Sequence, residues 1–425
     1  MTPRAEAAAR RAGMVAVLAL HLAACATAPH ARAPDPGVRS PAFRRLDGRG
    51  LDEAGVDAVV TRLMRDGKVP GLGVALIQDG RPVLVKAYGL RDIASGKPLT
   101  TGTVMSGASF TKVAFAWTVM TLVDEGRLDL DRPIAACLPR PLPEYEDYRD
   151  LAGDPRWERL TPRMLLGHTS GLPNWRRFND DKKLRIEFEP GSRYAYSGEG
   201  IDLLQMVLET GLGLDVGALM QARVFDRFGM TRTGMTWRDE FASDLATGYD
   251  EDGRPLPFDR REHVDAAGSM ATTVGDFSLF LAGVLRGDGL SEGARREMLR
   301  PQVAIRSTRQ FPTLATRTTE DNRGIDLAYG LGWGLFTSPF GPAWFKEGHD
   351  DGWNNYAVSF ERGRSALLLM ANSSNGEGIF KYLADALLGE TCLPWYWEGY
   401  VPYDRPDLWS DAELERPHPP CGSVR

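Results

Sequence analysis

The chain contains few of the residues that build metal sites. Among its 425 residues there are 4 cysteines and 6 histidines. His168, His263 and His349 lie far apart, and none has a second ligand three or four residues away, so zinc-type spacing is absent. The sequence therefore predicts neither a metal nor another cofactor.

A surplus of basic residues is also missing. The 51 Lys and Arg residues are outnumbered by 57 Asp and Glu, which gives a formal net charge of −6. A nucleic-acid-binding domain usually carries a positive patch. We therefore expect no nucleic-acid partner, and the length allows one large domain or two smaller ones.

Long apolar runs are absent beyond the N-terminus. There, three arginines precede a short apolar run, residues 14–24, that ends in Leu-Ala-Ala-Cys25. This pattern resembles the lipobox of bacterial lipoproteins, which are cleaved before the cysteine and acylated on it. We expect residues 1–24 to be a signal peptide, Cys25 to carry lipid and residues 25–48 to form a flexible linker. A secretory signal with an unrelated cysteine is the alternative.

Such an anchor predicts a location in the bacterial cell envelope. The domain would be tethered to a membrane and face the periplasm or the exterior. That compartment permits disulfides. Cys392 and Cys421 bracket an aromatic and proline-rich tail, residues 391–425, and could pair or remain two free thiols.

Hydrophobic periodicity predicts strands at both ends of the domain and helices between them. Residues 71–78 and 82–89 form β-type runs joined by Asp79-Gly80, a strong hairpin signal. Further strands are predicted at 328–336, 343–348, 355–361 and 365–371, and helices at 51–66, 109–123, 274–286 and 378–388.

This order predicts an α+β fold. We expect an antiparallel sheet built by both chain ends, flanked by helices and interrupted by a mostly helical insertion, over residues 49–390.

Ser109 and Lys112 form the sole Ser-x-x-Lys in the chain. Residues 113–123 are almost all apolar, so a buried helix beginning near Ser109 would place both side chains on one face. A serine hydroxyl needs a neighbouring base to become a nucleophile. A lysine in an apolar site can be that base, or it can help another group to act as the base.

Five stretches together resemble serine β-lactamase-like hydrolases, the group that includes class C β-lactamases, D-Ala-D-Ala carboxypeptidases, D-aminopeptidases and family VIII esterases. They occur in the family's order and are Ser-Phe-Thr-Lys at 109–112, then 165–173, 189–198, 267–273 and 329–334 followed by 348–352. No Gly-x-Ser-x-Gly elbow is present, which argues against an α/β-hydrolase. The resemblance implies the β-lactamase/transpeptidase-like fold.

The resemblance also implies roles for individual residues. Ser109 matches the nucleophile, Lys112 the helix lysine and Tyr196 the tyrosine of the second motif. A phenolate does not form near neutral pH unless cations stabilise it. His349 falls where the family has Lys-Thr-Gly or His-x-Gly, and the oxyanion-hole donors would be the N–H groups of Ser109 and Gly352.

Two positions depart from the family's pattern and bear on substrate binding. Gly198 stands where β-lactamases and peptidases usually carry Asn, and Asp351 stands where Gly normally lets substrate lie along the strand. Both changes disfavour β-lactam and D-Ala-D-Ala substrates and leave acyl transfer intact.

The sequence therefore predicts a membrane-anchored serine hydrolase that forms an acyl-enzyme on a small-molecule ester, amide or peptide. Ester hydrolysis is favoured over β-lactam hydrolysis. The alternative is a catalytically silent member that binds cell-wall peptides as a sensor or scaffold, which the two departures favour and the intact catalytic residues oppose.

Overall fold

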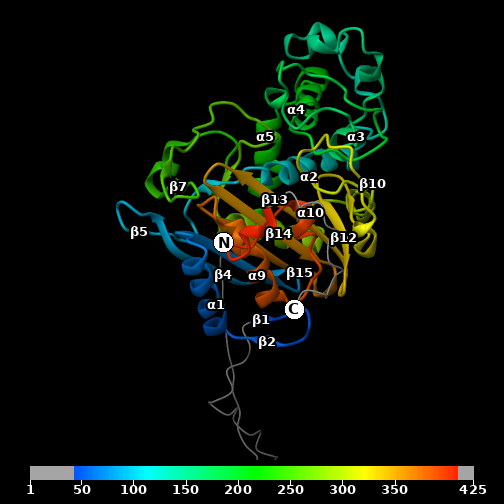
Figure 1. Cartoon of the computed structure of the whole chain (residues 1–425). Coiled ribbons are helices and arrows are strands. Elements are labelled where there is room, and N and C mark those ends of the chain that lie inside the picture. The colour runs from blue at the N-terminus through cyan, green and yellow to red at the C-terminus, as the bar shows by residue number, and fades with distance from the viewer. Residues whose placement is uncertain (1–42, 410–425) are drawn as a thin grey trace, which may run out of the picture. The chain divides into compact units, whose positions relative to one another are not determined.

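The computed structural model describes residues 43–409, and a nine-stranded sheet lies at its centre (Figure 1). All neighbouring strands are antiparallel. In spatial order the strands are β10 (Val303–Ala304), β11 (Ala328–Tyr329), β12 (Gly334–Ser338), β13 (Gly341–Asp350), β14 (Trp353–Phe360), β15 (Ser365–Ala371), β3 (Gly71–Gln78), β4 (Arg81–Asp92) and β5 (Lys97–Pro98).

The pairing of β15 with β3 joins the two ends of the domain within one sheet. This confirms the predicted antiparallel sheet built from both chain ends. The predicted hairpin is present between β3 and β4, where Gln78 pairs with Arg81. Asp79 and Gly80 both have positive φ, 53° and 71°, as a two-residue turn of this hand requires.

Helices cover both faces of the sheet. On one face α1 (Glu53–Asp66) packs against α9 (Glu377–Leu388); α2 (Phe110–Asp124) and α7 (Val274–Arg286) lie on the other. Successive strand residues alternate between the two cores: Leu367 belongs to the α1/α9 core and Leu368 to the α2/α7 core. Because both faces are covered, β3 and β15 are apolar except for Gln78 at the end of β3 and Ser365 at the start of β15.

Helices α2 and α7 form where their apolar residues and capping residues predict them. Every residue of α2 from Phe110 to Leu122 is buried, as its apolar composition predicts. Thr273 caps α7 by accepting a hydrogen bond from the Asp276 N–H, and Gly287 ends it with a φ of 79°.

The chain between α2 and α7 forms a region of short helices and loops that extends from the left of Figure 1 to its top. Its helices are α3 (Pro162–Leu166), α4 (Gly198–Met206), α5 (Val216–Met220) and α6 (Asp226–Phe228), and it contains the small sheet of β7 (Gly248–Tyr249) and β8 (Pro255–Leu256). β9 (Ala271–Thr272) returns the chain to the main domain by pairing with β6 (Met105–Ser106). Short helices α8 (Glu292–Met298) and α10 (Trp395–Glu398) follow later.

Within residues 43–409, no single helix is long and apolar enough to cross a membrane; one bent pair, Gly198–Gly211 with Val216–Phe228, meets the length and composition criteria together.

The N-terminal boundary differs from the predicted one. Residues 43–48, which we assigned to the linker, belong to the fold, because Phe43 is buried in the α1/α9 core. β1 (Phe43–Arg44) pairs there with β2 (Gly50–Leu51). The tail also packs on the domain, with Trp395 and Trp397 buried in the same core.

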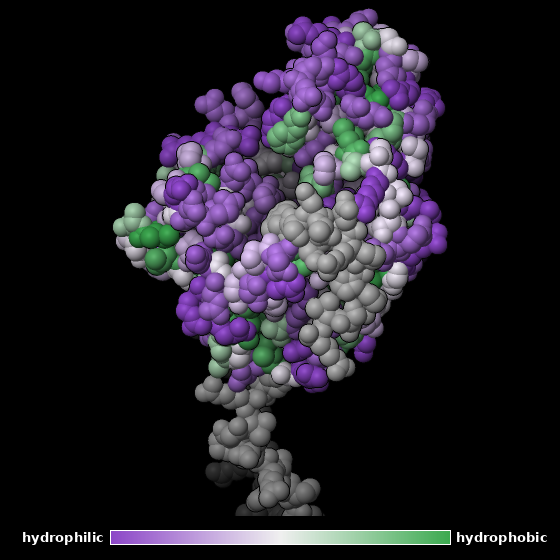
Figure 2. Space-filling model, viewed as in Figure 1, coloured by the Kyte–Doolittle hydropathy of each residue, from purple (hydrophilic) through white to green (hydrophobic). Residues whose placement is uncertain are grey.

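Three sequence predictions involve residues outside 43–409 and stay predictions. These are the signal peptide at 1–24, the lipidation of Cys25 and the pairing of Cys392, which is described, with Cys421, which is not. The face in Figure 2 is mostly hydrophilic, with hydrophobic residues in small separate groups. The large apolar side chains that are exposed, among the described residues, are Val83, Ile93, Phe178, Leu279 and Phe311.

Candidate active site

Ser109 lies at the N-terminus of α2, where the helix presents it beside Lys112. The Lys112 Nζ donates to Ser109 Oγ at 3.1 Å and to the Ala267 carbonyl at 2.6 Å. Lys112 is buried, so both acceptors compensate its lost hydration. Ala108, directly before Ser109, has a φ of 44°, a strained conformation of the kind that clusters at functional sites.

Tyr196 lies between two lysines. The Lys112 Nζ is 5.2 Å from the centroid of the Tyr196 ring, and the Lys346 Nζ is 4.9 Å from it. Lys346 also donates to the Tyr196 hydroxyl at 3.1 Å. Two ammonium groups around one buried phenol are an arrangement that stabilises a phenolate.

Lys346 is the site residue that the sequence analysis missed. It lies on β13, is fully buried, and its Nζ donates to Glu347 Oε1 at 2.8 Å and to the Glu347 carbonyl at 2.9 Å. Burial acts to lower the pKa of Lys346, but Glu347 and Tyr196 together more than offset this and the pKa is raised. Lys346-Glu347-Gly348 is itself a Lys-x-Gly, so the signal was present three residues before His349.

His349 does not lie where the sequence analysis expected it. It is three residues beyond Lys346 on β13, and successive side chains on a strand point to opposite faces. Its Nδ1 pairs with Glu377 at the start of α9 and lies 3.2 Å from the Asn354 Nδ2. Its side chain is 57% exposed. Burial acts to lower its pKa, but the Glu377 carboxylate reverses the effect and raises it.

The two predicted oxyanion-hole donors, the N–H groups of Ser109 and Gly352, differ in whether they are already hydrogen-bonded. The Ser109 N–H has no acceptor among the described residues, which leaves it available to substrate. The Gly352 N–H instead donates to Ser374 Oγ at 3.0 Å, so it is already engaged.

An open strand edge runs past the start of α2. β12 pairs with β13 only as far as Phe345, which leaves the following residues of β13 unpaired on that side. A Cβ on Gly348 would lie 2.9 Å from the Gly107 carbonyl, so this strand and the segment before Ser109 touch through a residue that must be glycine.

Gly198 begins α4, and the indole of Trp175 covers it. A Cβ at this position would lie 2.6 Å from the nearest atom of that ring. The Trp175 ring centroid is also 5.8 Å from the Lys112 Nζ. The space that an Asn side chain would occupy at position 198 is therefore filled by an aromatic wall.

His168 holds the backbone next to Tyr196 in place. It is fully buried, and its Nδ1 accepts a hydrogen bond from the Ser197 N–H at 3.2 Å. Burial holds its pKa well below its ordinary value, with further contributions from Lys112 and Lys346. An acceptor that fixes Ser197, the cap of α4, has an architectural role.

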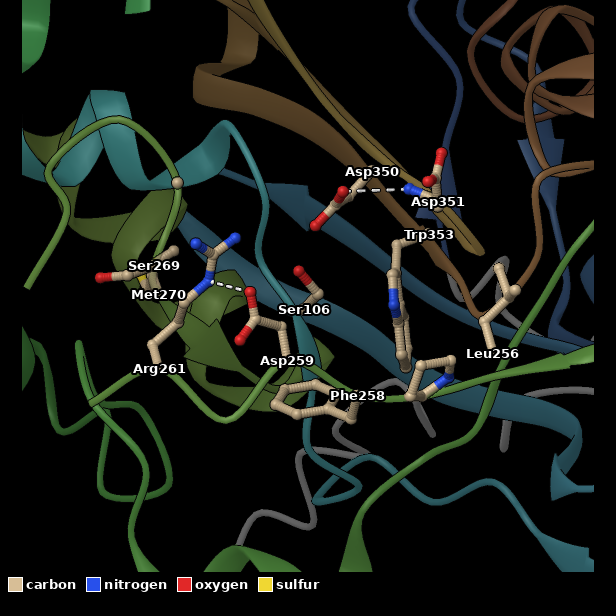
Figure 3. A pocket seen from close by; sticks show the side chains of 12 residues that line it. Ser106, Leu256, Phe258, Asp259, Arg261, Ser269, Met270, Asp350, Asp351 and Trp353 are labelled. Atoms are coloured by element: carbon tan, nitrogen blue, oxygen red, sulfur yellow. Dashed lines mark hydrogen bonds and ion pairs between the residues drawn. The ribbon is translucent and has the colours of Figure 1, made fainter. Parts of the chain in front are cut away.

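A cavity of about 220 Å³ has Ser106, three residues before Ser109, on its wall (Figure 3). Asp350, the last residue of β13, and Asp351, in the turn that follows, line it together with Asp259, Arg261 and Trp353. Asp259 and Arg261 pair at 2.8 Å, which leaves the Asp350 and Asp351 carboxyl groups in excess. Burial raises the pKa of Asp350. Asp351, predicted to contact substrate, therefore lies on the wall of an acidic pocket.

The chain is similar in sequence to several known proteins. The chain is 28% identical over 324 residues to an esterase, EstB, of Burkholderia gladioli, covering 68% of this chain and 80% of that one. It is 24% identical to a beta-lactamase of Yersinia enterocolitica, covering 68% of this chain and 70% of that one. It is also 24% identical to penicillin-binding protein 4* of Bacillus subtilis, covering 80% of this chain and 75% of the relative.

Solved structures share the fold. An octameric penicillin-binding protein homologue from Pyrococcus abyssi superposes with a TM-score of 0.64 at 22% identity, covering 80% of this chain and 78% of that one. The D-alanine carboxypeptidase AmpC from Burkholderia cenocepacia gives 0.62 at 21%, covering 79% and 98%. The Beta-lactamase family model matches residues 56–390. The chain therefore belongs to the Beta-lactamase family and is a serine hydrolase of that family.

Proposed function

We propose that this protein hydrolyses carboxylic esters through an acyl-enzyme on Ser109. The observation that carries the proposal is the continuous set of contacts from Ser109 Oγ to Lys112, and from both lysines to Tyr196. A nucleophile, a base and the cations that stabilise the base are within reach of one another.

In the proposed reaction Tyr196, as a phenolate held by Lys112 and Lys346, accepts the Ser109 hydroxyl proton. The Ser109 oxygen attacks the ester carbonyl, and the resulting oxyanion accepts from the Ser109 N–H and from an N–H on the open edge of β13. Each such donor lowers the barrier by roughly 3 kcal/mol. The intermediate collapses, the alkoxide takes the proton from Tyr196, and the alcohol leaves.

Water completes the cycle. It gives a proton to Tyr196 and attacks the acyl carbon of the Ser109 ester. As the second intermediate collapses, the proton returns to Ser109 Oγ and the carboxylic acid is released. No metal or redox group takes part in this sequence.

Three observations favour esters over β-lactams and peptides. Trp175 fills the space beside Gly198, so no amide side chain is available there to bond a substrate amide. Asp350 and Asp351 repel substrates that carry a carboxylate nearby. The relative from Burkholderia gladioli is named an esterase.

The silent-binder alternative is less well supported, because a protein that only binds peptides has no need to bury Lys112 and Lys346 around one phenol. The test compares kcat/KM for p-nitrophenyl butyrate and a chromogenic cephalosporin. We expect clear preference for the ester; preference for the cephalosporin would reject the substrate assignment, and activity on neither would favour the binder.

We also propose that Cys25 carries the lipid that tethers the enzyme to a membrane of the cell envelope. The basic region, short apolar run and Leu-Ala-Ala-Cys ending support this. Cell fractionation tests it: Cys25→Ser should move the protein from the membrane to the soluble fraction, whereas a soluble unaltered protein would reject the anchor.

A further inference from the structure

Glu347 forms an ion pair with the site lysine next to it in the chain. Its Oε1 accepts from the Lys346 Nζ at 2.8 Å, and neither side chain is exposed beyond 7%. A Lys ammonium has three N–H donors. The Lys346 Nζ contacts three acceptors, Glu347 Oε1, the Glu347 carbonyl and the Tyr196 hydroxyl. With two donors held by Glu347, the third is directed at Tyr196.

Glu347 is itself held in place by the segment that follows β10. Gln310, which is buried, donates its Nε2 to Glu347 Oε1 at 2.8 Å. The Gln310 N–H donates to the Trp397 carbonyl at 2.8 Å, which ties this contact to α10. The next residue, Phe311, lies edge-on to the Tyr196 ring with centroids 5.8 Å apart. Glu347 Oε1 therefore accepts hydrogen bonds from two partners, Lys346 and Gln310.

The surroundings leave Glu347 as the anion that compensates Lys346. Glu398 is another buried carboxylate nearby; burial, then the charge of Glu347, raises its pKa well above its ordinary value, which favours its uncharged form. Burial lowers the pKa of His168 well below its ordinary value, which favours the neutral imidazole. Other ionisable groups that interact with Lys346, Glu347 or Tyr196 are Lys112, Tyr194, Tyr329, Tyr356 and Tyr400.

We propose that Glu347 is a positioning residue that keeps Lys346 charged and directed at the Tyr196 hydroxyl. The proposal rests on the base role given to Tyr196 above. A buried lysine without a counter-ion loses its proton readily. Without Glu347, Lys346 would become neutral at a lower pH and would no longer stabilise the phenolate.

The first test is the pH profile of Glu347→Gln, which keeps the shape and removes the charge. We expect kcat for p-nitrophenyl butyrate to fall by at least about tenfold, with KM changed less. The alkaline limb of kcat/KM should move to lower pH by about one unit, equivalent to a tenfold change in proton affinity. Glu347→Asp should restore part of both effects. Glu377→Gln, which alters the acid beside His349 on the other face, is the matched control and should leave the profile unchanged.

A fall in kcat without movement of the alkaline limb, or no change in either, would overturn the proposal. A second measurement does not need turnover. In a double-mutant cycle of Lys346→Met and Glu347→Gln, urea unfolding at pH 8 should give a coupling of at least about tenfold in the unfolding equilibrium constant. A wild-type enzyme inert towards esters would reject the proposed function, while the cycle still decides whether Glu347 holds the charge of Lys346; zero coupling would overturn that.

Discussion

Lys346 and His349 are two basic residues on one strand, three positions apart, and they have opposite environments. Lys346 is fully buried and contacts Tyr196 and Glu347. His349 is more than half exposed and pairs with Glu377 from α9. An odd separation on a strand puts two side chains on different faces. The comparison teaches that strand parity, more than residue type, decides which cation serves the nucleophile.

The largest effect should be the difference between replacing Lys346 and replacing His349 by a neutral residue. Lys346→Met removes a cation that stabilises the base, so kcat/KM for an ester should fall by roughly 10²–10⁴-fold. His349→Gln should change it by less than about threefold, because no contact of His349 reaches the site. Steady-state assays of both variants measure this. Equal losses, or a greater loss for His349→Gln, would reverse our assignment of the two faces.

Gly348 lies on the same face as Lys346, where β13 approaches the start of α2. Replacing Gly348 tests whether this close approach is needed for activity. In Gly348→Ala the new Cβ would lie 2.9 Å from the Gly107 carbonyl, so the strand and the nucleophile segment must separate. A displacement of this kind should cost about 10²-fold in kcat/KM. Gly324→Ala is the control, because a Cβ there meets nothing within 4 Å. Full activity of Gly348→Ala would mean that the contact is unimportant for the site.

The turn beyond His349 should influence specificity to a smaller extent. Asp351→Asn removes one carboxylate from the cavity wall, which should raise kcat/KM for an ester with a carboxylate in its acyl group by roughly fivefold, or ~1 kcal/mol. A neutral ester of the same size should be unaffected and serves as the control substrate. An equal effect on both esters would show that charge repulsion is not the cause.

The smallest effect concerns stability on the His349 face. Because Glu377 raises the pKa of His349, the pair contributes stability that is fully present below the unfolded value of 6.5 and is lost as pH rises through the raised folded value. His349→Gln should therefore lower Tm at pH 5.5 more than at pH 9. The side chain is largely exposed, so the loss should stay below about 1 kcal/mol. A loss that grows with pH would contradict the sign of this linkage.

Features encoded by neighbouring residues could be predicted from the sequence. The hairpin at Asp79-Gly80, the buried α2 and the capped α7 each depend on signals within a few residues. The Ser109–Lys112 contact also follows from helix geometry, because the two residues lie one turn apart.

Features that depend on distant segments could not be predicted in the same way. The face of β13 that meets Tyr196 is decided by its register with β14, and a shift of one residue would exchange the two faces. The strand predicted at 343–348 ends before His349, so the prediction does not specify the face on which His349 lies. The indole over Gly198 comes from Trp175, which no pattern around Gly198 reveals. Phe43 likewise could not be assigned to the fold from its neighbours in sequence, because the core that buries it is formed by distant segments.

The most direct test of the account is covalent labelling with a fluorophosphonate, followed by intact mass spectrometry. The reagent requires an activated serine and no knowledge of the natural substrate. We predict one adduct on the wild-type protein, none on Ser109→Ala, slow labelling of Lys346→Met and wild-type labelling of His349→Gln. Equal labelling of Ser109→Ala and wild type, or an unlabelled wild-type protein, would contradict the claim that Ser109 is an activated nucleophile.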